Sequence, residues 1–172
     1  MNFDTLSKYL NWSERSFAQG VTRAVAFGGI ASAILLLFSS LVFALIGAAN
    51  VGSLAAAHVF KTGWFFTTLA AVIWAPLWET LIAQLIPISL LTSLKARPSI
   101  AIVSSATLFS AGHIAYGGGI GQGLVTLAAG LLFASLFAAN ARPGIVRASL
   151  FTAAAHAANN ALLVLMSYGF GI

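Results

Sequence analysis

Five long apolar stretches, separated by short segments that hold most of the charges, constrain the fold of this chain more than any other feature. They cover residues 24–48, 63–94, 99–115, 122–139 and 145–168. Of the 172 residues, 60% are hydrophobic and 6% are charged, against about 25% charged residues in an average soluble domain. A chain so poor in polar side chains cannot cover a water-exposed surface, so most of its surface must face lipid. We therefore predict an all-α, polytopic transmembrane helical bundle of about five spans.

The same pattern divides the chain into two parts. Residues 1–23 are a polar and interfacial N-terminal segment, and residues 24–172 are a single transmembrane helical domain. The N-terminal segment can form a short interfacial helix with Trp12 at headgroup depth, or a solvated lead-in to the first span. The basic residues behind the net charge of +5 are spread singly and form no patch, so no nucleic acid partner is indicated. The partner that the composition implies is the lipid bilayer.

The second apolar stretch is too long for one straight crossing. A helix over 63–94 would be about 48 Å long, against a hydrocarbon core of about 30 Å. Pro76 and Pro87 lie inside it, and each proline removes a backbone donor and kinks a helix. The stretch is therefore either one tilted, broken span or two crossings that divide at Pro76.

The positions of the basic residues favour one broken span. With five spans, seven of the eight basic residues fall on the same side of the membrane as the N-terminus, and only Lys61 falls on the other. Cytoplasmic loops carry the excess of lysine and arginine. We therefore expect a multi-pass protein of the inner cell membrane, with the N-terminus cytoplasmic and the C-terminus extracytoplasmic. The seven residues are Lys8, Arg15, Arg23, Lys95, Arg97, Arg142 and Arg147.

Glu79 is the only acidic residue in the hydrophobic part of the chain, within "WAPLWETLIAQLIP" at 74–87. A carboxylate at the bilayer centre costs roughly 2.5–3.5 kcal/mol, so it normally faces the bundle interior and has a partner. The basic residues lie near span ends, which leaves His113 and His156 as candidate partners. His58 falls in an outer loop and is not included.

These residues lie at compatible depths. Glu79 and His156 are near the middle of their spans and His113 is in the outer half, so the three side chains can meet in one cavity. His156 and Asn160 are four residues apart and share a helix face, and the ring of Phe109 can pack beside His113 for the same reason. The alternative is that the histidines and the asparagine only join helices, at about 0.6 kcal/mol each.

Three short motifs, in chain order, resemble those of the intramembrane glutamic proteases of the CAAX-protease and bacteriocin-processing (Abi) family. That family shows Glu-Glu-x-x-x-Arg, then Phe-x-x-x-His, then His-x-x-x-Asn or Asp. This sequence has "ETLIAQ" at 79–84, "FSAGH" at 109–113 and "HAANN" at 156–160. The resemblance covers about residues 72–165, with a proline before the first motif.

The resemblance implies a metal-independent glutamic endopeptidase that uses no cofactor and processes a membrane-associated protein or peptide. Glu79 and His113 would hold and deprotonate a water molecule, and His156 and Asn160 would donate hydrogen bonds to the oxyanion. The first motif departs from the family, because Thr80 stands in place of the second Glu and Gln84 in place of the Arg. The chain is therefore a divergent active member or an inactive relative.

Two other classes of function stay open. A glutamate and two histidines can bind zinc, but no His-Glu-x-x-His helix is present and the three residues come from three spans. Glu79 can instead carry protons in a transport or scaffold subunit that cleaves nothing. For the protease, the outer position of His113 indicates a cut on the extracytoplasmic side, such as in a C-terminal sorting tail.

Overall fold

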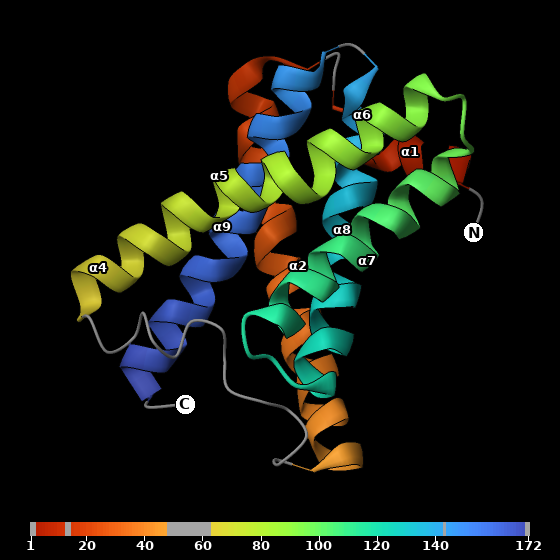
Figure 1. The fold of residues 1–172 in the computed structure, drawn as a ribbon. Helices are drawn as coiled ribbons and strands as arrows, with labels where there is room; N and C mark the ends of the chain where they lie inside the picture. Colours follow the sequence, from red (N-terminus) through yellow and green to blue (C-terminus); the bar gives the residue numbers. More distant parts are fainter. Residues whose placement is uncertain (1–2, 13–14, 48–62, 143, 171–172) are drawn as a thin grey trace.

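The computed structural model describes residues 3–12, 15–47, 63–142 and 144–170, and within these residues all regular structure is helical (Figure 1). Five helices in this part of the chain are long and apolar enough to cross a membrane, which confirms the all-α polytopic fold. The chain is therefore a multi-pass membrane protein. His58 and Lys61 lie outside the described residues. The helices are α1 Phe3–Leu10, α2 Phe17–Ile46, α4 Trp64–Thr68, η2 Leu69–Trp74, α5 Ala75–Glu79, η3 Thr80–Leu85, α6 Ile86–Ser93, α7 Pro98–Ala115, α8 Ile120–Ala141 and α9 Ile145–Phe170.

The second span is one broken helix, as the distribution of basic residues predicts. Its segments α4, η2, α5, η3 and α6 follow one another without a gap over Trp64–Ser93. Two of them, η2 and η3, are π-helical, and each ends two residues before a proline, Pro76 or Pro87. A π-helical turn is the form in which an α-helix takes up an extra residue, often at a functional site. We call this span the broken helix.

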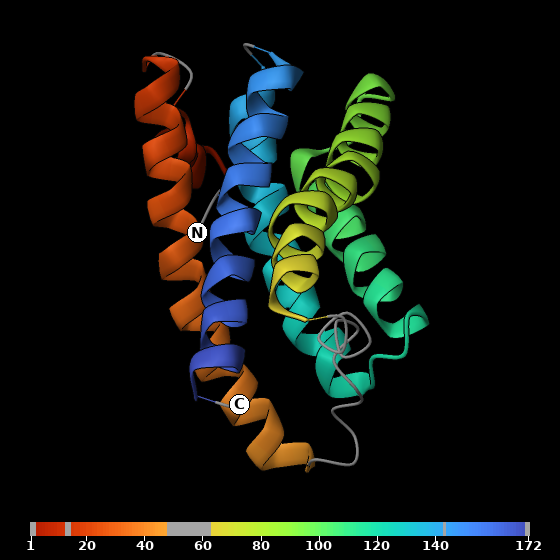
Figure 2. The same ribbon diagram turned by 90° about the vertical axis from the view of Figure 1, so that its left-hand side faces the viewer.

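Helix α9 is the helix around which α2, α8 and the broken helix pack. It packs against α2 on one side and against η2, α5 and η3 of the broken helix on the other (Figure 2). The approach to α2 is close, because a Cβ on Gly28 would collide with the backbone carbonyl of Ala155. Helix α8 packs against α7, α9 and α2 and carries much of the buried apolar surface, including Phe133 and Phe137.

The N-terminal segment is tied to the bundle rather than left as a solvated lead-in. Helix α1 packs on α8, where the Asn140 side chain accepts a hydrogen bond from the backbone N–H of Trp12 and donates one to the carbonyl of Leu10. The ring of Trp12 is buried against Phe27 and Phe151. Burial within the bundle does not fix the depth of a side chain along the membrane normal, so the headgroup depth of Trp12 stays a prediction.

Candidate active site

Glu79 and His156 lie side by side. Glu79 is the last residue of α5, and its Oε2 atom is 3.4 Å from Nε2 of His156 on α9. The side chain of His156 is 4% exposed and that of Glu79 is 32% exposed, so the glutamate lies where the buried imidazole meets an accessible space. The contact does not have hydrogen-bond geometry, and Oε2 is itself buried and has no hydrogen-bond partner among the described residues. The exposed part of the Glu79 side chain therefore lies at its other atoms.

Two phenylalanine rings hold the imidazole of His156 in place. The ring of Phe133 stacks on it at a centroid distance of 4.7 Å, and the ring of Phe109 meets it edge-on at 5.6 Å. Both phenylalanines are buried. Because its face and flank are covered, His156 has little freedom to rotate, and its Nε2 edge stays directed at Glu79. Phe133 was not predicted, since nothing distinguishes it from other residues of an apolar span.

His113 joins the same cluster through Phe109. The imidazole of His113 packs on the Phe109 ring at 4.6 Å, as its spacing predicts, and the Phe109 ring also contacts His156. Nδ1 of His113 is 3.0 Å from the carbonyl oxygen of Phe109. A carbonyl oxygen only accepts hydrogen bonds, so Nδ1 carries the hydrogen and Nε2 of the neutral ring is left as an acceptor.

Asn160 lies one helical turn beyond His156 and contacts the broken helix. Its Nδ2 donates a hydrogen bond of 2.8 Å to the carbonyl oxygen of Ala71 in η2. Its Oδ1 accepts a hydrogen bond of 3.1 Å from Nδ2 of Asn159. The amide of Asn160 is therefore already engaged on both sides by the protein.

The two residues that depart from the family motif are buried and uncharged. Thr80 and Gln84 are 1% and 0% exposed. Neither the hydroxyl of Thr80 nor either amide atom of Gln84 has a hydrogen-bond partner among the described residues. Thr80 also borders a cavity of about 220 Å³ between the broken helix and α9, which neither Glu79 nor His156 lines. The other residues that line it are Leu77, Leu81, Ser149, Leu150 and Ala153.

The structure thus brings the four residues predicted from the sequence into one region, but only two of them are in direct contact. Glu79 and His156 are in direct contact, His113 is linked to His156 across Phe109, and Asn160 reaches past them to η2. Within the described part of the chain, no three histidine, cysteine or carboxylate side chains are grouped closely enough to hold a metal ion.

The fold and this geometry define a class: a helical membrane protein in which a carboxylate and two imidazoles from three different spans share one buried aromatic cluster. The family model described as Type II CAAX prenyl endopeptidase Rce1-like matches residues 61–162. This is more than half of the chain, and the chain belongs to that family. The resemblance seen in the three motifs is thereby confirmed. No curated protein and no solved structure matches the chain.

Membership of this family indicates a general class of function. The family implies a CAAX-type peptidase, which is a hydrolase acting on peptide bonds, and its substrate is a protein embedded in the membrane. The matched region contains all three motifs and all four candidate residues.

Proposed function

We propose that the protein is an intramembrane glutamic endopeptidase that needs no metal and cleaves a membrane-anchored protein or peptide. The observation that carries the proposal is the contact of 3.4 Å between Glu79 and His156 in a span region that otherwise lacks acidic residues. An ionisable side chain within a membrane span normally has a partner and takes part in the function of the protein. Membership of a CAAX-type peptidase family indicates that this function is peptide hydrolysis.

The reaction begins with water bound at the carboxylate of Glu79, whose side chain is about one-third exposed. The carboxylate takes one proton from this water as the oxygen attacks the carbonyl carbon of the scissile peptide bond. Nε2 of His113, left as an acceptor by the hydrogen bond at Nδ1, orients the same water. The carbonyl oxygen becomes an oxyanion, and an N–H of His156 stabilises it in a site screened from bulk water by Phe109 and Phe133.

The second half of the reaction returns the proton. Glu79 gives it to the nitrogen of the leaving amine as the carbon–nitrogen bond breaks. The products are a carboxylic acid and an amine, and Glu79 is again a carboxylate. Each proton and electron pair is thereby accounted for without a further reactant. Because Glu79 is about one-third exposed, a peptide can reach it without unfolding of the bundle.

The proposed substrate is anchored in the inner cell membrane, with the enzyme's N-terminus cytoplasmic. His113 is in the last turn of α7, close to the end of the bundle that the distribution of basic residues assigns to the outside. The proposed cut is therefore in or just outside the membrane on the extracytoplasmic side, for example in a C-terminal sorting tail.

The neutral pair Thr80 and Gln84 favours a second candidate, a relative that binds a membrane protein without cutting it. The family pattern has a glutamate and an arginine at these positions, and here no charge replaces them. A carrier of protons through Glu79 belongs to the same non-proteolytic class. Both variants of this class predict that no peptide terminus depends on Glu79.

The deciding experiment compares peptide termini in cells that express the wild type or Glu79→Gln, using mass spectrometry of membrane and secreted fractions. Glutamine keeps the size and polarity of the side chain but cannot take the proton. We expect one or a few termini to disappear in Glu79→Gln at unchanged protein abundance. Glu14→Gln, which removes one of the two carboxylates of the N-terminal segment, is the matched control and should leave the termini unchanged. Identical termini in wild type and Glu79→Gln would refute proteolysis.

A further inference from the structure

The carbonyl of Ala71 is a backbone group that the broken helix cannot satisfy by itself. In the π-helical register of η2, the N–H of residue i bonds to the carbonyl of residue i−5, as the N–H of Ala75 does with Ala70. The next donor in that register belongs to residue 76, and residue 76 is a proline. Proline has no N–H, so the acceptor five residues before it, Ala71, loses its helical partner.

Asn160 supplies the missing donor. Its Nδ2 donates to the Ala71 carbonyl at 2.8 Å, a normal hydrogen-bond length. A carbonyl without a partner in an apolar environment costs about 1–3 kcal/mol, so this part-buried bond fixes η2 against α9. Asn159 in turn donates to Oδ1 of Asn160, which sets the orientation of the amide and leaves its nitrogen pointing at η2.

The position of Glu79 depends on this bond. Glu79 lies three residues beyond Pro76 in the same broken helix, and it meets His156, which lies one turn before Asn160 on α9. The bond between Asn160 and Ala71 and the contact between His156 and Glu79 thus both join the broken helix to α9. They lie on successive turns of α9. Losing the first bond frees η2 and α5 to shift along α9, which changes the distance between Glu79 and His156.

We propose that Asn160 is a positioning residue: it replaces the backbone N–H that Pro76 lacks, and so holds Glu79 at His156. The carbonyl of Ala71 engages one of the two hydrogens on Nδ2. The role in cleavage rests on the proposed function, whereas the role in holding the broken helix does not.

The test is a double-mutant experiment with Asn160→Ala and Pro76→Ala. Asn160→Ala should lower the cleavage rate by about ten- to a hundredfold, the range expected when a reacting group is misplaced by about 1 Å. Pro76→Ala restores an N–H at the residue that should donate to Ala71, so the double variant should recover to within about threefold of Pro76→Ala alone. Combining Asn160→Ala with Pro87→Ala is the matched control and should not recover, because Pro87 belongs to the other break.

Hydrogen exchange of residues 69–79 in lipid nanodiscs gives a measurement that needs no substrate. Exchange should rise in Asn160→Ala and return to the level of Pro76→Ala in the double variant. Two results would overturn the proposal: unchanged exchange in Asn160→Ala, or a double variant whose exchange recovers while its cleavage does not. The second result would make Asn160 a direct oxyanion donor. Recovered exchange in a protein whose Glu79→Gln variant leaves all termini in place would refute the proteolysis and keep the positioning role.

Discussion

The side chain that faces the carboxylate of Glu79 inside the bundle is the imidazole of His156, and not a lysine or an arginine. Among the described residues, no lysine or arginine lies within 4.0 Å of this carboxylate. The family motif has an arginine five residues after this glutamate, and here Gln84 occupies that position. The position of the Glu79 side chain therefore depends on its contact with His156 and not on a pairing with an arginine. Substitution of Gln84 should then change the stability of the protein without removing this contact.

Gln84 offers such a test at a single residue. Its side chain is fully buried and neither amide atom has a partner among the described residues. Replacing an unsatisfied buried amide by an apolar group of similar shape removes a desolvation penalty. We therefore expect Gln84→Met to raise the stability of the protein by about 1–3 kcal/mol.

Thermal unfolding in detergent micelles measures this effect. Gln122→Met, at the half-buried start of α8, is the matched control and should change the midpoint little. A lower midpoint for Gln84→Met would contradict the prediction, and it would show that the amide has water partners inside the bundle.

At the scale of elements, a neighbouring helix donates a hydrogen bond to the broken helix near each of its two breaks. Asn160 of α9 donates to Ala71 before Pro76, and Ser105 of α7 donates through its hydroxyl to the carbonyl of Ala83. In the π-helical register of η3 the N–H of Ile86 bonds to the carbonyl of Leu81, so the acceptor that Pro87 leaves is Ile82 and not Ala83. The bond to Ala71 therefore replaces a donor that proline lacks, whereas the bond to Ala83 does not, and the site lies between the two breaks.

The second break allows a contrasting test that needs no cleavage assay. Ser105→Ala should lower stability by about 1–3 kcal/mol, because the buried carbonyl of Ala83 loses its donor. Pro87→Ala should leave this loss unchanged, because the N–H that it returns to the helix pairs in the register of η3 with Ile82 and not with Ala83. Thr107→Val on the same helix, whose hydroxyl donates to Val103 within α7, is the control. A smaller loss for Ser105→Ala in the Pro87→Ala background would show that the proline does leave Ala83 without a donor. Unfolding midpoints of the four variants decide the matter.

How far the sequence predicts these elements depends on the kind of signal that each leaves. Apolar length identified all five spans, and the two prolines identified the broken one. The start of α2 at Phe17, seven residues before the predicted 24, was missed because the capping box of Ser16 and Gln19 begins the helix inside a polar stretch. Spacing within one helix predicted the contact of Phe109 with His113. Contacts between helices, such as Phe133 with His156, leave no periodic signal in either helix.

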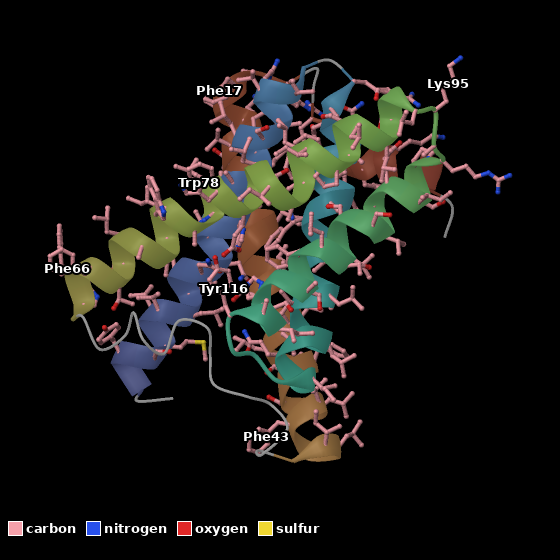
Figure 3. The ribbon with its side chains drawn as sticks, viewed as in Figure 1. Phe17, Phe43, Phe66, Trp78, Lys95 and Tyr116 are labelled. Carbon is pink, nitrogen blue, oxygen red and sulfur yellow. The ribbon has the colours of Figure 1, made fainter. Side chains whose placement is uncertain are left out.

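At the scale of the whole molecule, the described spans alternate in direction. As a result, the start of α2, the α6–α7 turn and the ends of α8 and α9 that adjoin each other lie at one end of the bundle (Figure 1). Phe17 and Lys95 mark this end in Figure 3, and Phe43 lies at the opposite end. The basic residues that the structure describes lie near this first end, and membrane proteins keep the end richer in lysine and arginine in the cytoplasm. We therefore predict that this end of the bundle is cytoplasmic.

Single-cysteine labelling tests the orientation directly, because the native chain contains no cysteine. Leu94 in the α6–α7 turn is 68% exposed, and Tyr116 after α7 is 81% exposed. We expect an impermeant maleimide to label Tyr116→Cys in intact cells and Leu94→Cys only after the membrane is permeabilised. The cysteine-free parent is the control for background labelling. The reverse pattern would invert the topology. Tyr116 is three residues from His113, so the side that reacts is also the side of the membrane nearest to this histidine, where we propose that the substrate is cut.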